Sequence, residues 1–585
     1  MLHPAFAFLV TLAIAGGIYG LGDWLVPRAG AGARWVFGWT TLWWVIALPA
    51  QLVRPKVGAA FGLAMTVVGL ARMLRRGGES KRALVIGGSA LILGAPLWLA
   101  PPHFYDALVY HLGLPWSWLA NRSFAPVDHN LFSHFPLAAS TVFLLPVAAK
   151  APEAAAGLHW LTFIAVLGSL AALSRNLGAG RWSWAAPALL CGTWHAPWLA
   201  SLAAADHLVI LGIVAAAESW TSPREADPPW AETGVPLGLA LSAKYTALVP
   251  VAALLLAALA LRRPRWHAIA AGATGFAVSS FWWIRNLIDV GNPIHPLLWS
   301  VFGGRGWSAD EYARYSTLVR EGVSGTRGVL TGVLKLGLPS GLGLWLGIAT
   351  LAALAAVLRA REESSRSAFV ALAAVLAVAG WAATSQTSRY ALPAAALIAA
   401  LAAAGIAQLS PWLARATAGL LGIAVAHGVL TLGVFLFDTI GIQRAWMGTE
   451  SREAWRHDVT LNDPAGAYRA AGEVLPKDAR ILIVGEGRSW LCPRPHRVSS
   501  PYDTQWLQSV VEHSSSAEEV GDAVAGDGWT HLLINWAEVN RLGGEDYRVL
   551  RWKSPEDQAR FREFGKSFTE PVWTDGPLEI RALRR

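Results

Sequence analysis

The segment from Pro101 to Pro136 concentrates the residues of this chain that could do chemistry. Its sequence, PPHFYDALVYHLGLPWSWLANRSFAPVDHNLFSHFP, holds two Asp and four His among aromatic side chains. It follows the apolar run Arg82 to Ala100, which is long enough to cross a bilayer. A loop that only connects two helices does not need this chemistry. We therefore interpret the segment as the catalytic loop of a membrane enzyme.

Two carboxylates of this loop, Asp106 and Asp128, are the candidate catalytic groups. Asp106 could take a proton from an attacking hydroxyl, and its apolar neighbours would keep it basic by desolvation. As an alternative, Asp106 is a helix N-cap. Asp128, within PVDHN, is a second active-site carboxylate or a turn former. His111 lies one helical turn beyond Asp106 and is a candidate substrate-binding group.

The histidines of the loop do not show a spacing that is diagnostic of metal binding. We therefore predict no metal site and no cofactor, with a divalent cation as the alternative.

Cationic residues beside apolar stretches form a second set of candidates. Lys244 interrupts an apolar region and Arg389 borders one, and ionisable groups in such places are costly and usually functional. Arg suits the geometry of a phosphate. Arg285 could assist, or could snorkel to the membrane interface. Asp206, at a tight turn, and Tyr390 complete the set of candidate substrate-binding residues, with helix capping as the alternative for Asp206.

The composition indicates that a membrane bundle positions these residues. The chain is 54% hydrophobic and only 15% charged, against about 25% charged in soluble proteins. The net charge of +9 is typical of basic cytoplasmic loops rather than of nucleic-acid binding. We predict an α-helical polytopic membrane protein with roughly 11–14 transmembrane helices. The expected helices lie near 5–21, 35–53, 57–71, 83–100, 154–174, 184–203, 208–220, two short helices in 234–261, 267–284, 340–358, 367–384, 391–408 and 416–437.

Charge asymmetry predicts the topology. The basic loop before Arg82 should be cytoplasmic, which places the loops 101–153 and 285–339 and everything after Phe437 outside. We divide the chain into N-terminal transmembrane helices (1–82), a transmembrane catalytic module (83–437) and a small extracytoplasmic α/β domain (438–585). In that domain, Gly485-Glu486-Gly487 follows an expected strand but lacks the other features of a dinucleotide site, so we set that function aside.

The order of these features resembles the GT-C superfamily of polyprenyl-phosphate-sugar glycosyltransferases, close to bacterial relatives of protein O-mannosyltransferases and aminoarabinose transferases. The matching pieces are YDALVYHLGLP, DHNLFSHFP, AADHLVILGIV, LSAKYTALV, WWIRNLIDVGNPIHPLLWSVFGG and SRYALPA. The resemblance implies a catalytic Asp at Asp106, and lipid-phosphate binding by Lys244 and Arg389. It also implies a bacterial cytoplasmic membrane location. The chain departs from the family pattern because Asp106 is followed by Ala rather than by a second acidic residue.

The leading hypothesis is therefore an integral membrane glycosyltransferase that moves a sugar from a polyprenyl-phosphate donor to an extracytoplasmic lipid, glycan or protein acceptor. A phosphate leaving group needs no general acid, so one base and cationic stabilisation suffice. The alternatives are a transporter or flippase for a lipid-linked or anionic solute, and a polymer-assembly scaffold. Transporters show repeated halves and midplane polar sites, whereas here the polar residues collect in outer loops.

Overall fold

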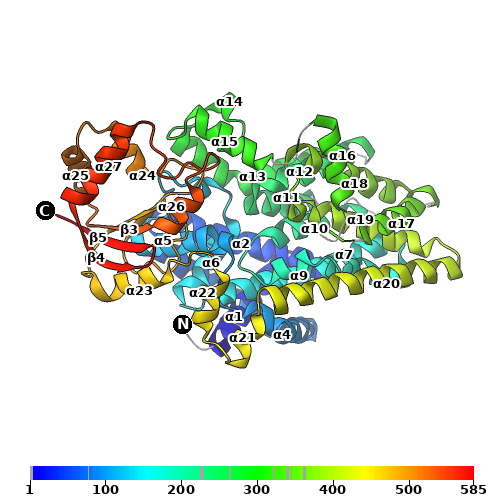
Figure 1. The fold of residues 1–585 in the computed structure, drawn as a ribbon. Helices are drawn as coiled ribbons and strands as arrows, with labels where there is room; N and C mark the ends of the chain where they lie inside the picture. The colour runs from blue at the N-terminus through cyan, green and yellow to red at the C-terminus, as the bar shows by residue number, and fades with distance from the viewer. Residues whose placement is uncertain are drawn as a thin grey trace.

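The computed structural model describes residues 4–76, 78–223, 230–261, 265–320, 323, 325–336, 342–343, 345–359 and 364–584. A bundle of helices forms most of the molecule, and a small α/β domain lies against one end of it (Figure 1). The bundle contains α1 (Pro4–Leu25), α2 (Ala31–Leu52), α3 (Pro55–Arg75), α4 (Gly78–Trp98), α6 (Ala138–Ala148), α7 (Glu153–Asn176), α8 (Ala185–Cys191), α9 (His195–Ala200), α10 (Asp206–Thr221), α11 (Trp230–Ala243), α12 (Leu248–Leu261), α13 (Trp266–Val290), α17 (Trp345–Arg359), α18 (Ser364–Thr384), α19 (Leu392–Ala407) and α20 (Pro411–Val434).

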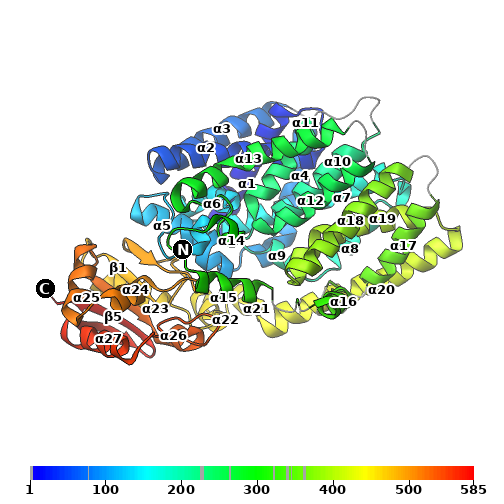
Figure 2. The same cartoon turned by 90° about the horizontal axis from the view of Figure 1, so that it is seen from above.

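The apolar helices confirm a multi-pass membrane protein. Six segments of the described chain are long and apolar enough to cross a membrane, namely α1, α3, α7, most of α18, Ser388–Ala407 and Pro411–Thr439. Four shorter apolar helices lie among them. Seen from above, α2 and α3 lie at one side of the bundle and α17 and α20 at the other (Figure 2).

Two helix breaks in the bundle can be compared with the helices expected from the sequence. The expected break at Lys244 is confirmed, because α11 ends at Ala243 and α12 begins at Leu248 after a short 3-10 turn. The single helix expected over 184–203 is wrong, because the chain forms α8 and α9 instead. The break lies at Gly192, whose carbonyl would be 1.7 Å from a Cβ added at Gly428 of α20. Close backbone contact between these two glycines thus accompanies the interruption.

The C-terminal domain contains a five-stranded sheet in the order β2-β1-β3-β5-β4. The strands are β1 (Ile481–Val484), β2 (His496–Val498), β3 (His531–Asn535), β4 (Thr569–Asp575) and β5 (Leu578–Leu583), and β1 is parallel to both β2 and β3. Apolar strand residues pack against helices on both faces. The helices from α21 onward are α21 (Ile442–Met447), α22 (Arg452–Val459), α23 (Ala465–Val474), α24 (Trp506–His513), α25 (Ala517–Gly526), α26 (Trp536–Leu542) and α27 (Pro555–Ser567).

Polar residues of the loop 101–136 attach this domain to the bundle. The loop contains α5 (Gly113–Asn121), whose last residue exchanges two 2.8 Å hydrogen bonds with the backbone of His496. Asn130 donates to the carbonyl of Val498 at 3.1 Å, and Trp116 donates to the carbonyl of Cys492 at 2.7 Å. Between α13 and α17, the short helices α14 (Trp299–Phe302), α15 (Ala309–Val319) and α16 (Gly325–Leu336) complete the described structure. Several polar side chains of this loop therefore hold the C-terminal domain against the bundle.

Candidate active site

Asp106 lies where the chain leaves α4 and enters a π-helical turn, Ala107–His111. The carboxylate makes no helix-capping hydrogen bond, so the capping alternative does not explain it. Its Oδ2 accepts a hydrogen bond from the Tyr110 hydroxyl at 3.1 Å and from Nη2 of Arg389 at 3.0 Å. The Asp106 side chain is 19% exposed, so this carboxylate is partly desolvated but still reachable.

Arg389 and Tyr390 lie in a 3-10 turn, Ser388–Ala391, that precedes α19. The guanidinium of Arg389 lies over two aromatic rings, 5.3 Å from the centroid of Tyr390 and 5.7 Å from that of Phe104. Its ion pair with Asp106 is therefore flanked by aromatic rings, and the two side chains are only 20% and 19% exposed. Such a setting strengthens electrostatic interactions.

A second ion pair also lies beside Tyr390. Lys244 donates from Nζ to Oδ2 of Asp206 at 2.9 Å, and both side chains are nearly buried. Nζ also lies 5.8 Å from the centre of the Tyr390 ring. Asp206 and Arg389 line one small cavity together. Four predicted site residues, from four separate parts of the sequence, are thus gathered around Tyr390.

A cavity of about 310 Å³ opens in front of Asp106. Asp106, Arg389 and Tyr390 line it from the bundle, whereas Tyr502 and Arg541 line it from the C-terminal domain. Six of the ten tyrosines in the chain line this cavity. Apolar and aromatic walls with a few converging polar groups are typical of a small-molecule site. We call it the Asp106 cavity.

Five predicted site residues do not line the Asp106 cavity. Two of them, Lys244 and Asp206, form the ion pair beside Tyr390, and the other three lie elsewhere. The side chain of Asp128 is 79% exposed and lies 3.6 Å from Arg497. His111 is buried, with Nδ1 3.2 Å from the Ser140 hydroxyl. Arg285 is buried and donates to the carbonyl of Ser133, so it holds the loop from the bundle side.

Sequence reasoning missed the cavity residues that come from distant segments. Tyr315 lies on α15, Tyr502 and Tyr547 lie in loops of the C-terminal domain, and Arg541 lies on α26. Each stands in an ordinary polar context in the sequence, so no local signal marks it. Only the packing of α15 and of the C-terminal domain at this end of the bundle brings these residues to the site.

Among the residues that the structure describes, no three His, Cys, Asp or Glu side chains are grouped closely enough to hold a metal ion.

The structure thus combines a helical membrane bundle, a polar site at one end of it and an α/β domain that lines the same site. Among solved structures, the crystal structure of ArnT from Cupriavidus metallidurans bound to undecaprenyl phosphate matches with a TM-score of 0.53 at 13% identity. The match covers 86% of this chain and 98% of that chain. The GT-C fold expected from the sequence motifs is therefore confirmed.

Two further matches have lower TM-scores. The apo crystal structure of the same ArnT matches at 0.49, with 13% identity over 86% of this chain and 98% of that one. The oligosaccharyltransferase AglB from Archaeoglobus fulgidus matches at 0.43, with 12% identity over 79% of this chain and 72% of that one. No family model matches the chain, and no curated protein matches it in sequence.

Proposed function

We propose that this protein is an integral membrane glycosyltransferase that takes a sugar from a polyprenyl-phosphate donor. The observation that carries the proposal is the placement of Asp106, Arg389 and Tyr390 together in one cavity of about 310 Å³. A base and a guanidinium in one aromatic cavity match what transfer from a lipid phosphate requires. The fold, shared with an ArnT solved with undecaprenyl phosphate, supports the choice of donor class.

In the proposed reaction, Asp106 is the general base. Both of its described hydrogen bonds end on Oδ2, so we assign Oδ1 to the acceptor hydroxyl. As the acceptor oxygen forms a bond to the anomeric carbon, its proton passes to Asp106 and the bond from that carbon to the phosphate oxygen breaks. The lipid phosphate leaves as an anion, so no acid is needed.

Arg389 and Lys244 stabilise the departing phosphate in this proposal. Arg389 lines the cavity directly. Lys244 lies near the Tyr390 ring and pairs with Asp206, which lines a small cavity together with Arg389 and Tyr390. The two cations are each paired with a carboxylate, so the charges of these four side chains balance. An incoming phosphate would draw Arg389 away from Asp106, which frees the base when the donor is bound.

The charge distribution supports an extracytoplasmic site. Asp23, near the end of α1, lies 3.6 Å from Arg34 and 3.7 Å from Arg72 and pairs with Arg76. This basic cluster lies at the opposite end of α10 from Asp206, because a Cβ added at Gly30, just before α2, would be 3.0 Å from Glu218 near the end of α10. Basic ends face the cytoplasm. We therefore propose a bacterial cytoplasmic membrane location with the cavity and the C-terminal domain outside.

Sugar transfer in membranes tests the proposal. Membranes from cells that lack the native gene, with and without the cloned protein, would receive labelled polyprenyl-phosphate sugars. Label should move to an acceptor only when the protein is present. A failure to transfer label from any such donor would contradict the proposal and favour a transporter.

A further inference from the structure

A second cavity, of about 390 Å³, lies beside the Asp106 cavity. The two cavities share Tyr105 and Arg541 in their linings. The second cavity is enclosed by the bundle through Trp198 and by the C-terminal region through Thr460. Its volume falls within the range of about 300–1,000 Å³ that is usual for small-molecule sites. We call it the Trp198 cavity.

Three buried polar atoms in its lining lack hydrogen-bond partners among the described residues. They are the Tyr105 hydroxyl, Nε1 of Trp198 and the Thr460 hydroxyl. Thr460 is only 5% exposed. Leaving a buried polar group unpaired is unfavourable, so three such groups around one cavity indicate that a polar ligand binds there. These groups offer donors and hydroxyl acceptors, which match the hydrogen bonding of a polyhydroxylated ligand.

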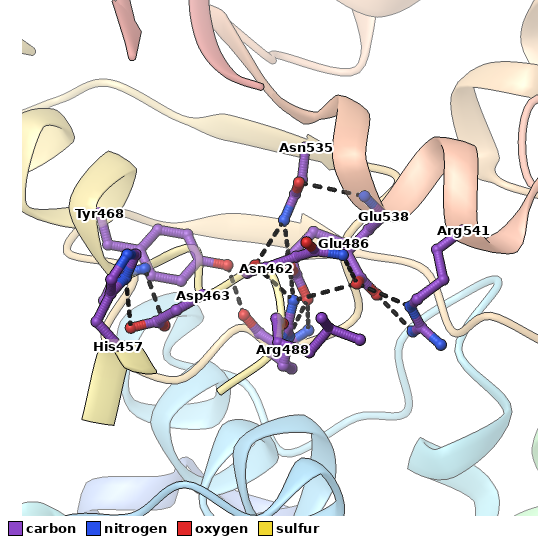
Figure 3. A network of polar contacts seen from close by, with 11 residues as sticks. His457, Asn462, Asp463, Tyr468, Glu486, Arg488, Asn535, Glu538 and Arg541 are labelled. Atoms are coloured by element: carbon purple, nitrogen blue, oxygen red, sulfur yellow. Dashed lines mark hydrogen bonds and ion pairs between the residues drawn. The ribbon is translucent and has the colours of Figure 1, made fainter. Parts of the chain in front are cut away.

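The charged residues of the cavity are neutralised by one another. Arg488 makes two hydrogen bonds to Glu486, at 2.7 and 2.6 Å, and Arg541 makes two to Glu538, at 2.9 and 2.6 Å (Figure 3). Asn462 donates to Glu538 at 2.7 Å and so adds to the same network. Each arginine is held by its own carboxylate. Arg389 makes one hydrogen bond to Asp106, whereas Arg488 and Arg541 each make two to their carboxylates and are harder to draw away. The network therefore offers no surplus cation to an anionic ligand, and this favours a neutral one.

Aromatic rings complete the match to a sugar. Phe104 and Trp198 both line the cavity and meet edge to face, with centroids 5.5 Å apart. Aromatic side chains pack against the apolar surface of a ligand and can add an N–H or O–H group for its polar edge. Trp198 and Tyr105 supply both features here.

We propose that the Trp198 cavity binds a neutral saccharide unit of the acceptor. This inference rests on the proposed glycosyltransferase function. The bound unit presents a hydroxyl past Tyr105 and Arg541 to Asp106 in the neighbouring cavity. The acceptor class is then a glycan or glycolipid with an uncharged sugar, and the C-terminal region forms part of its binding site.

Direct sugar binding tests this inference without any catalysis. Full-length protein in detergent would be titrated with methyl glycosides of glucose, galactose, mannose and N-acetylglucosamine, with saturation-transfer NMR as the readout. At least one glycoside should bind to the wild type. Thr460→Val keeps the shape but removes the hydroxyl, and should weaken that binding about fivefold, the value of one hydrogen bond of about 1 kcal/mol. Trp198→Phe should weaken it by at least as much.

Thr431→Val is the matched control, because Thr431 lies on an exposed face of α20 and only bonds to its own helix. Its glycoside binding should equal that of the wild type. Inorganic phosphate should not displace the glycoside. Binding of phosphate in place of every glycoside would overturn the inference, as would the absence of any glycoside binding. Either result would leave sugar transfer from a polyprenyl-phosphate donor as a separate measurement of the proposed function.

Discussion

Arg389 donates from Nη2 to Oδ2 of Asp106 at 3.0 Å, although 283 positions separate the two residues in the chain. The contact joins the first large loop after α4 to the turn before α19, and it lies at the wall of the Asp106 cavity. Asp106 is therefore both the proposed base and the residue that orients the proposed phosphate ligand. We therefore expect substitutions of Arg389 and of Asp106 to have different effects on sugar transfer.

Arg389→Lys should raise the KM for the donor about tenfold, the equivalent of 1.4 kcal/mol, because lysine keeps the charge but loses the planar fork that suits a phosphate. Transfer rates at varied donor concentration would measure the change. Arg444→Lys is a suitable control, since Arg444, on α21, pairs with Glu450 and Asp458 and does not line the cavity. An unaltered donor KM in Arg389→Lys would remove Arg389 from the donor site.

The ion pair between Lys244 and Asp206 should show strong coupling. Lys244→Met leaves the carboxylate of Asp206 nearly buried without its partner, and breaking such a pair costs about 3–5 kcal/mol. The double variant Lys244→Met with Asp206→Asn should regain most of the lost stability. Thermal unfolding in detergent measures both effects. Simple addition of the two single effects would argue against a coupled pair.

Arg541→Gln should lower transfer at least tenfold, although the residue belongs to the C-terminal domain. Arg541 lines both cavities, and its loss leaves Glu538 without a bidentate partner. Arg562→Gln, on the exposed side of α27, is the control and should retain activity. Equal activity of the two variants would mean that the domain does not contribute this side chain to the reaction.

Docking of the C-terminal domain should weaken as the pH rises. Burial raises the pKa of Asp503 to about 6, and this carboxyl accepts from the Leu131 amide and from Trp307. Because the folded-state pKa lies above the usual value of about 3.9, its stabilisation is complete below about pH 4 and is lost as the pH rises through about 6. The Tm of the wild type minus the Tm of Asp503→Asn should therefore decrease as the pH rises from about 4 to about 6. A constant difference would exclude this role.

The sequence predicts site residues best where a charged residue stands beside an apolar stretch. Lys244 and Arg389 stand beside apolar stretches, and the structure brings both next to Tyr390. Short strand-like runs at 480–484, 531–535 and 578–581 predict strands in the C-terminal domain, and the structure has β1, β3 and β5 there. The topology and domain boundaries remain predictions.

The sequence was uninformative where function depends on docking. Asp128 and Asp106 look alike as loop carboxylates, but Asp128 pairs with Arg497 at the surface. Glu486 belongs to a weak glycine motif in the sequence, whereas in the structure its carboxylate is fully buried against Arg488. The pair of Asp128 with Arg497 joins segments far apart in the chain, so no local pattern predicts it.

The most direct test of the central claim is transfer of labelled sugar by Asp106→Asn beside Asp128→Asn. Both substitutions make the same chemical change in the same loop, but only Asp106 lines the cavity. Loss of a general base typically lowers the rate about 10²–10⁴-fold. With equal protein in the membrane, Asp106→Asn should lose at least a hundredfold in rate, and Asp128→Asn should stay within about twofold of wild type. Wild-type rates in Asp106→Asn would contradict the assignment of the base.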